Sequence, residues 1–411
     1  MTIDSIERGF IYYYVIVSII AACILGQIPH VSFVLSVSTV VGALFILILR
    51  VREKSACKSP HRSIILFWII MLGLILAKGQ TTSDVKLAIN MSVQCWILAS
   101  TDKCQNKERW LSNLSCILKL YVYCITVLNV VGLLLFVKYD TLIYHDLYFI
   151  KLSNNSFSGL YLNPNSAGYI SYLSIAFCFI LRILDKKSLL FPITISLACL
   201  ILSFSRGALG CLIVFFIFYF FKKTSNNNKI LLVTLGLISV MLLCLCGYLS
   251  LDAIGDIYGK GAEDPFNGRL LLWQEGFYAF RDNIWTGVGY GHFQEYMLNR
   301  NPSLEHMGLI GGGLHNFYLQ IGVTFGIIGL LIYIIFFSYI LTDKTIFQDS
   351  ETYMLFSTMK IVILTICLMG LFEVILLTTN IVSTFFWLLS GSVLSIKTCD
   401  GKKNVGNHTM L

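Results

Sequence analysis

The sequence has little charge and little proline. Only 13% of its 411 residues are Asp, Glu, Lys or Arg, whereas a soluble domain usually carries about 25%. There are six prolines, and 56% of the residues are hydrophobic. A chain of this length could form two or three soluble domains, but this composition argues against them and favours a chain that lies in lipid.

Other missing features narrow the class of protein further. Strands of alternating polarity, which would indicate a membrane β-barrel, do not occur. The 13 cysteines form no Cys-x-x-Cys pair and no Cys/His cluster, so we predict no metal site. None of them falls in a loop expected outside the cytoplasm, which argues against a disulfide scaffold. No Asp-x-Asp motif is present, which disfavours a metal-dependent nucleotide-sugar transferase, and we predict no cofactor.

Long apolar runs recur along the whole chain. A run of roughly 18 apolar residues can cross a bilayer as a helix, and helices are the default spanning element because lipid offers the backbone no hydrogen-bond partners. The first run has no small-residue cleavage site, so we predict an uncleaved span. We therefore predict an all-α, polytopic integral membrane protein with about 12 transmembrane helices, at residues 10–28, 31–49, 63–78, 85–100, 115–137, 165–183, 188–204, 207–221, 230–251, 316–341, 354–377 and 381–396.

This pattern divides the chain into four parts. Residues 1–251 hold the first nine predicted helices, and residues 252–315 form a large outer loop. Residues 316–396 hold the last three helices, and residues 397–411 form an inner tail. A second sizeable outer loop covers residues 138–163.

The distribution of Lys and Arg gives the orientation, because these residues accumulate in cytoplasmic loops. With the N-terminus inside, 19 of the 30 lie in inner segments and nine in outer ones. Both termini are then cytoplasmic. The net charge of +8 reflects this topology, and we predict no nucleic-acid partner.

Charged residues within the spans are few and lie close to the span ends. Lys119 and Lys360 are near predicted inner ends, where long side chains can reach water, and Glu373 is near an outer end. No ionisable residue occupies a mid-bilayer position. An ion-coupled transporter usually needs one, so this absence counts against transport.

Three basic residues gather at predicted outer boundaries. Arg206 follows an apolar span, and its guanidinium is suited either to a phosphate or to an interfacial anchor. Arg269 opens an amphipathic segment, predicted helical around 270–280, where it is either a ligand or a solvated helix charge. His315 precedes the tenth span, and it is either structural or a general base, a common role for imidazole.

Two further segments carry weaker signals. The Gly-Val-Gly-Tyr-Gly segment at 287–291 has neither the preceding strand nor the following Lys-Ser/Thr of a nucleotide loop. We interpret it as a turn that brings backbone close to another part of the molecule. The Asn-Pro-Asn segment at 163–165 predicts a helix cap, with Asn165 accepting backbone hydrogens.

Together these segments resemble the O-antigen ligase and O-antigen polymerase superfamily. The matching pieces, in order, are Ser-Arg-Gly at 205–207, Gly-Arg at 268–269 with Trp273, the glycine-rich 287–291, and His-Asn-Phe-Tyr-Leu at 315–319. The Asn-Pro-Asn segment and Gly-Ile-Ile-Gly at 326–329 also fit. The resemblance is detailed over residues 160–340 and elsewhere is only one of hydropathy.

This resemblance implies a metal-independent glycosyltransferase of the bacterial inner membrane. It would move a glycan from undecaprenyl diphosphate onto a glycan or lipid A-core acceptor at the periplasmic face. Arg206 and Arg269 would bind the diphosphate and stabilise the leaving group. Arg269 and His315 would be catalytic, with His315 deprotonating or orienting the acceptor hydroxyl. Asn165 and Asn316 would support the site.

Three functions remain open, two of them within this class of glycosyltransferase and one outside it. A polymerase, to which we lean, joins repeat units on the lipid carrier, and a chain-length regulator is then a possible partner. A ligase instead delivers the finished glycan to lipid A-core. The alternative of another class is a lipid-glycan transporter without enzymatic activity. In all three cases the lipid bilayer is the surroundings of the chain.

Overall fold

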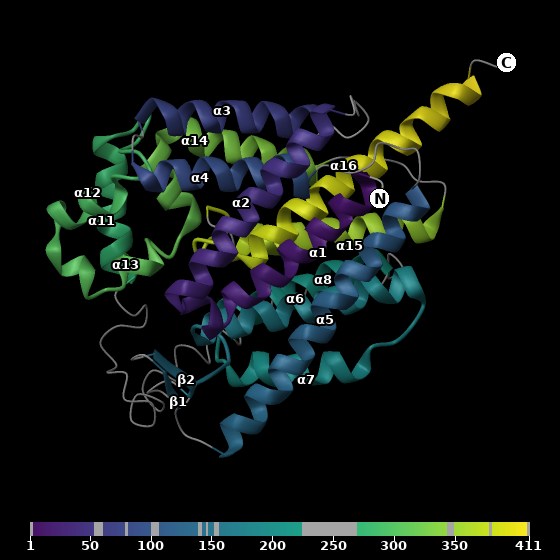
Figure 1. Cartoon of the computed structure of the whole chain (residues 1–411), viewed down its shortest axis with the longest axis horizontal. Coiled ribbons are helices and arrows are strands. Elements are labelled where there is room, and N and C mark those ends of the chain that lie inside the picture. The colour runs from purple at the N-terminus through teal and green to yellow at the C-terminus, as the bar shows by residue number, and fades with distance from the viewer. Residues whose placement is uncertain are drawn as a thin grey trace.

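The computed structural model describes most of the chain, and most of the described residues are helical (Figure 1). The bundle helices are α1 (Ile3–Ala22), α2 (Pro29–Arg52), α3 (Arg62–Lys78), α4 (Thr82–Val93), α5 (Lys107–Lys138), α6 (Pro164–Asp185), α7 (Leu190–Leu202), α8 (Arg206–Lys223), α14 (Phe317–Leu341), α15 (Ser350–Met369) and α16 (Ile381–His408). The described residues are 3–52, 61–78, 81–99, 107–138, 142–144, 147–151, 156–223, 269–342, 349–377 and 380–408.

The all-α membrane architecture is confirmed. Six described helices are long and apolar enough to cross a membrane, namely α1, α2, α5, α6, α14 and α15, and α7 and part of α16 are shorter apolar helices. Each predicted span except 230–251 falls on one of the bundle helices. The span at 230–251 and the loop residues 252–268 lie outside the described residues, so the number of spans stays a prediction.

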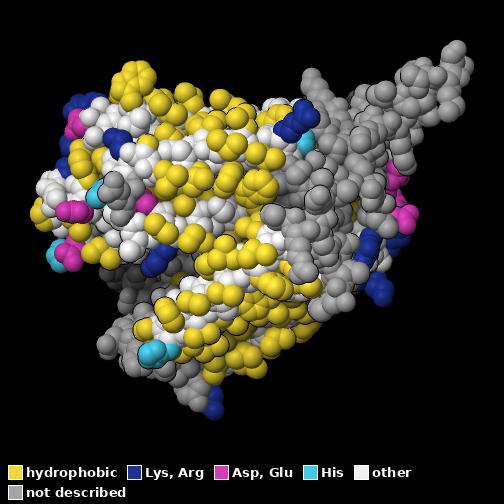
Figure 2. All heavy atoms as spheres, turned by 45° about the horizontal axis from the view of Figure 1, so that its top comes forward, with side chains coloured by type: hydrophobic (Ala, Val, Ile, Leu, Met, Phe, Trp, Pro, Cys, Tyr) yellow, Lys and Arg dark blue, Asp and Glu magenta, His cyan; other side chains and the backbone are white. Residues whose placement is uncertain are grey.

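The surface of the bundle is apolar where lipid would contact it. In the space-filling view, hydrophobic side chains cover the middle of the visible face, and charged side chains gather toward its two ends (Figure 2). On α2, Phe33, Val41 and Ile48 are 69%, 59% and 63% exposed. Contiguous exposed apolar surface of this extent marks a membrane contact in a folded chain.

Local sequence signals explain several helix starts. Pro29 and Pro164 occupy the first residues of α2 and α6, where the missing N–H of proline costs nothing. Thr81 and Asp84 form a capping box at α4, in which each side chain accepts from the other residue's backbone N–H. Such reciprocal caps satisfy two of the orphan donors of a helix N-terminus.

Some predicted boundaries are wrong. The span predicted over 85–100 consists of α4, which ends at Val93, and a π-helical turn, Gln94–Leu98. The span predicted over 354–377 ends at Met369, where Gly370 caps α15. Hydropathy alone did not reveal this end because the residues beyond it, 374–377, are as apolar as the helix.

A small sheet was also not predicted. Strands β1 (Leu142–Tyr144), β2 (Leu147–Lys151) and β3 (Phe157–Gly159) form an antiparallel sheet in the order β1-β2-β3. Strands of three to five residues are too short to show an alternating pattern. Phe157 is fully buried, and it is the nearest side chain to Gly132 of α5, so the sheet is anchored on the bundle.

A compact cap of short helices closes one end of the molecule. It consists of α11 (Arg269–Asp282), α12 (Phe293–Arg300), η4 (Pro302–Glu305) and α13 (Leu309–Gly312). These elements have their own apolar core, which includes Leu272, Phe293 and Met297. α11 confirms the amphipathic helix expected around 270–280. In Figure 1 the cap lies at the left, and both chain termini lie toward the opposite side.

The glycine-rich segment 287–291 joins this cap to a break in α14. Gly326 has φ +66° and ψ −167°, which interrupts the helix. The backbone N–H groups of Val288 and Gly289 donate to the carbonyls of Val323 and Thr324, both at 2.9 Å. In a membrane protein, a broken helix is tolerated only where protein groups satisfy the freed backbone. The segment 287–291 supplies two of these hydrogen bonds.

The same segment also touches the connection between α3 and α4. The N–H of Gly291 donates to Asp84 Oδ1 at 2.9 Å, and a Cβ on Gly291 would lie 1.9 Å from Thr81 Oγ1. Burial, and then the nearby Asp84 carboxylate, raise the pKa of Tyr290. The interpretation of 287–291 as a turn that brings backbone close to another segment is therefore confirmed.

Candidate active site

Glu373 lies at the centre of a polar cluster on the inner side of the cap. Its Oε1 accepts hydrogen bonds from Asn165 Nδ2 at 2.7 Å and from Arg269 Nη2 at 3.0 Å. Its Oε2 lies 3.1 Å from His315 Nδ1. The side chains of Arg269, His315 and Glu373 are 19%, 22% and 18% exposed. One carboxylate therefore connects three elements that are far apart in the sequence.

The partner of Nδ1 fixes the orientation of the imidazole. An ionised carboxylate can only accept hydrogen bonds, so Nδ1 of His315 carries the proton in this contact. In the neutral ring Nε2 then keeps a lone pair, which is the form that a general base requires. Glu373 also bears the opposite charge to an imidazolium, which stabilises the ring after it has taken a proton.

His315 sits in an unusual backbone conformation. Its φ is +48°, a region that side chains other than glycine rarely adopt and that concentrates at functional sites. It follows a turn in which Gly311 and Gly313 have φ +87° and +63°. Gln320 holds the turn, because its Oε1 accepts from the N–H of Leu314 at 3.0 Å. The glycines thus form the tight turn that presents the histidine.

Gly312 leaves space for the ring itself. A Cβ at this position would lie 2.4 Å from Nε2 of His315 and 2.7 Å from its Cε1. The backbone of Gly312 is not in the left-handed region, so the ring, and not the chain conformation, requires glycine here. The edge of the imidazole that would act as a base therefore faces a position where only hydrogen fits.

Arg269 is held by the turn that follows α15. It is the first residue of α11, and its Nη1 donates to the carbonyl of Phe372 at 3.0 Å. One turn along α11, Trp273 Nε1 donates to the carbonyl of Leu314 at 2.9 Å. These two contacts tie the start of α11 to the residues just before Glu373 and His315. The other N–H groups of the guanidinium have no partner among the residues that the structure describes.

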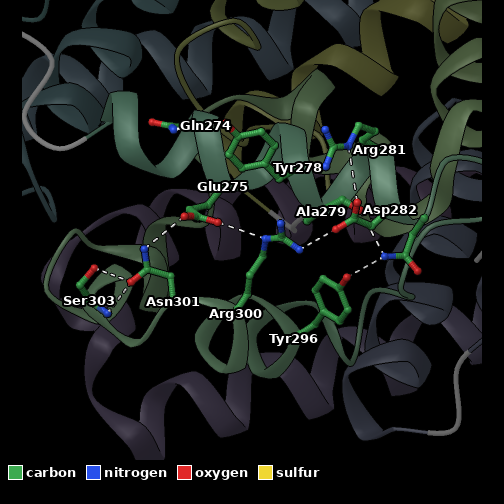
Figure 3. A network of polar contacts seen from close by, with 11 residues as sticks. Gln274, Glu275, Tyr278, Ala279, Arg281, Asp282, Tyr296, Arg300, Asn301 and Ser303 are labelled. Atoms are coloured by element: carbon green, nitrogen blue, oxygen red, sulfur yellow. Dashed lines mark hydrogen bonds and ion pairs between the residues drawn. The ribbon is translucent and has the colours of Figure 1, made fainter.

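The cap is braced on its far side by a second network, shown in Figure 3. Arg300 of α12 bonds Glu275 Oε2 at 3.1 Å and Asp282 Oδ2 at 2.7 Å, both on α11. Asn301 donates to the other oxygen of Glu275 at 3.3 Å. In this network α12 holds α11 in place, and it is separate from the cluster around Glu373.

Arg206 lies apart from the cluster. It begins α8, its side chain is exposed, and among the described residues it has no hydrogen-bond or ion-pair partner. The next residue, Gly207, packs against α6, where a Cβ would lie 2.4 Å from Tyr169 Oη. Tyr169 is one helical turn from Asn165 and within electrostatic reach of Glu373 and Arg269.

The charge of Arg206 lies at the N-terminus of α8. A helix N-terminus carries a partial positive charge and free N–H groups, so a cation there is unfavourable unless an anion joins it. The sequence placed Arg206, Arg269 and His315 on one face. The structure brings Arg269 and His315 together through Glu373. Arg206 does not join them, but the next residue, Gly207, packs against Tyr169, which lies one turn from Asn165 on α6.

The two supporting asparagines have different roles. Asn316 caps α14, because its Oδ1 accepts from the N–H of Leu319 at 3.0 Å. The Asn-Pro-Asn segment caps α6 as predicted, but the capping role expected of Asn165 is wrong. Asn163 caps α6 by accepting from Ser166 N at 2.8 Å, while Asn165 points its amide toward Glu373. The residue two positions earlier fills the cap because Pro164 must be the first residue of the helix.

Glu373 was not among the predicted site residues. The only signal was an acidic residue near the outer end of an apolar span. Its partners come from three separate regions of the sequence, which no local pattern links. Among the described residues, no group of three or more His, Cys, Asp or Glu is arranged to hold a metal ion.

The apolar bundle and the polar cluster beneath its cap define a polytopic α-helical membrane protein with a site at one end. Residues 191–334 match the family described as O-Antigen ligase, and this match confirms the similarity to the O-antigen ligase and polymerase superfamily. The matched part, roughly a third of the chain, contains Arg206, Arg269 and His315 but neither Asn165 nor Glu373. No curated protein matches the chain.

Proposed function

We propose that the protein is a glycosyltransferase that moves a glycan from undecaprenyl diphosphate onto a sugar hydroxyl in O-antigen synthesis. The observation that carries this proposal is the pairing of His315 Nδ1 with Glu373 beside Arg269. It combines an oriented base with a cation suited to a diphosphate. The match to the O-Antigen ligase family over 191–334 supports the same class of membrane glycan enzyme.

The proposed step uses one base and two cations. Nε2 of His315 takes the proton of the acceptor hydroxyl as its oxygen bonds to the anomeric carbon. The bond from that carbon to the diphosphate oxygen breaks, and undecaprenyl diphosphate leaves with the electron pair. Arg206 and Arg269 stabilise the negative charge that develops on it. No metal ion is required in this scheme.

We further propose that the site faces the periplasm and that both termini are cytoplasmic. The Lys and Arg distribution supports this orientation, and so does the position of the cap at the opposite side from the termini in Figure 1. Within the class we favour a polymerase over a ligase, on the Asn-Pro-Asn segment and the two sizeable outer loops. The same topology places the tail at residues 397–411 in the cytoplasm and the large loop at residues 252–315 in the periplasm.

Complementation tests this function. The gene is expressed in a strain that lacks its O-antigen polymerase and in one that lacks its ligase, each making the matching repeat unit. We expect a restored glycan ladder in the first strain. Glycan restored on lipid A-core only in the second would make the protein a ligase. No restoration in either strain, with normal membrane insertion, would favour a transporter.

The diphosphate role has a sharper test in two arginines of one helix. Arg269→Lys keeps the charge but loses the paired N–H groups that bind a phosphate side-on, so we expect activity to fall at least about tenfold. Arg281→Lys is the control, because Arg281 is 65% exposed at the other end of α11. Equal activity of the two variants would contradict the role of Arg269.

A further inference from the structure

A cavity of about 180 Å³ lies on another side of Glu373. Its wall comes from the end of α1, the first turn of α6 and the connection between α15 and α16. Neither His315 nor the two arginines line it. The cavity is therefore distinct from the base and the cations, although Glu373 and Asn165 belong to both places.

The lining combines polar and apolar groups. The polar groups include the amides of Asn163 and Asn165, the hydroxyl of Ser166 and the carboxylate of Glu373, with Tyr169 and Asn380 also in the wall, and small apolar residues, Ala21 and Ala22, face the cavity from α1. A pyranose ring combines hydroxyls around its edge with apolar C–H groups on its faces. The mixed lining of the cavity suits these two kinds of surface.

Several of the polar groups have hydrogen-bonding capacity to spare. Within the part of the chain that the structure describes, Asn163 bonds only through its Oδ1, to the N–H of Ser166, which leaves its amide hydrogens. Within the same residues, Asn165 bonds only through Nδ2, to Glu373, which leaves its carbonyl oxygen. The hydroxyl of Ser166 has no partner among the described residues, and its backbone N–H, not the hydroxyl, takes part in the helix cap. Donors and acceptors are thus both present.

The size of the cavity argues against an oligosaccharide and its charge against a diphosphate. Pockets for drug-sized ligands hold roughly 300–1,000 Å³, so this cavity suits a single ring and not an oligosaccharide. No Lys or Arg lines it, and Glu373 would repel a diphosphate. Water alone would fill the space with about six molecules, which is the alternative that a test must separate.

We propose that this cavity is a subsite for one sugar ring of a glycan substrate, held by Ser166, Asn163 and Asn165 beside Glu373. The proposal rests on the proposed function. Glu373 then has two neighbours, the sugar on one side and the imidazole on the other. The ring belongs either to the lipid-linked donor or to the acceptor, and the kinetics of each substrate distinguish the two.

The test uses purified full-length protein in lipid nanodiscs, with donor and acceptor concentrations varied separately. Ala22→Leu fills the cavity, and Ser166→Ala removes one hydroxyl without touching the helix cap. We expect the KM for one substrate to rise at least about tenfold in Ala22→Leu and roughly three- to tenfold in Ser166→Ala, with kcat within about twofold. The substrate whose KM rises is the one whose sugar the cavity binds.

Ala77→Leu, at an exposed position of α3, is the control for the added side chain. Unchanged KM for both substrates in a folded Ala22→Leu protein, or in Ser166→Ala if the first variant does not fold, would show a water-filled cavity and overturn the proposal.

A second readout does not depend on transfer. The thermal unfolding of the wild-type protein is measured with glucose, galactose, mannose or N-acetylglucosamine at high concentration. A rise in Tm with one of these sugars, absent in Ala22→Leu, would support the subsite even if no transfer is detected. Wild-type protein that neither transfers glycan nor responds to any sugar would remove the support for both proposals.

Discussion

At the scale of single residues, the site depends on Glu373. It accepts hydrogen bonds from Asn165 and Arg269 and lies against Nδ1 of His315. A carboxylate with this many charged and polar neighbours couples the base to the cation. A diphosphate that binds Arg269 would compete with Glu373 for the same guanidinium. The orientation of the imidazole and the binding of the donor are therefore expected to influence each other.

Glu373→Gln tests this coupling. The amide keeps the shape but loses the negative charge, so the Nδ1–H form of His315 is no longer favoured. We expect kcat to fall at least about tenfold, as the contribution of a well-placed base is roughly 10²–10⁴. The donor KM should fall as well, because the neutral amide no longer competes with the diphosphate for Arg269. Glu373→Asp should recover part of the activity. A Gln variant with wild-type kcat would exclude Glu373 as a positioning residue.

Gly312→Ala tests the space beside the imidazole. The new methyl group would lie 2.4 Å from Nε2, so the ring must turn away from Glu373. We expect activity to fall by about 10² or more, with little change in Tm because the backbone conformation suits alanine. The control is Gly73→Ala on α3, where no atom lies within 4 Å of the added carbon. Full activity of Gly312→Ala would contradict the assigned geometry.

At the scale of elements, the break in α14 connects the cap to the bundle. Three features of the sequence meet there: Gly326, the glycine-rich 287–291 and the capping box of α4. The carbonyls of Val323 and Thr324 would be unsatisfied in lipid without the bonds from 287–291. The cap, and with it Arg269, is thus held in place by backbone bonds to a membrane helix.

Gly326→Ala should disrupt this junction. The residue has φ +66°, and its Cβ would lie 2.2 Å from the carbonyl oxygen of Trp285. We expect a loss of roughly 2–4 kcal/mol in the free energy of unfolding, measured as a lower Tm in detergent. Gly210→Ala on α8, with nothing within 4 Å, should leave Tm unchanged. A Tm equal to that of the wild type would show that the break is not required.

At the scale of the whole molecule, the cap and the loop between α6 and α7 should lie on opposite sides of the membrane. Single cysteines at two exposed positions, His306→Cys near α13 and Lys187→Cys after α6, test this in a cysteine-free background. A membrane-impermeant maleimide applied from the periplasmic side should label the first and not the second. Labelling of both, or of Lys187→Cys alone, would contradict the orientation.

The sequence by itself determined the class of the protein. Long apolar runs can satisfy their backbone in lipid only as helices, so the all-α bundle followed from composition and run length. The positions of Arg206, Arg269 and His315 on one predicted face followed from the Lys and Arg distribution. The amphipathic α11 and the close backbone approach of 287–291 were also predicted, because helical periodicity and glycine spacing are local properties of the chain.

Only the tertiary structure decided how the site is assembled. Glu373, Asn165, Arg269 and His315 are separated by up to about two hundred residues, and their contacts arise from the packing of α6, α11, α14 and the turn after α15. The end of α15 at Met369 was not predicted for the same reason. Hydropathy records where a helix can lie in lipid, whereas the hydrogen-bond partner of a buried carboxylate depends on which helices pack beside it.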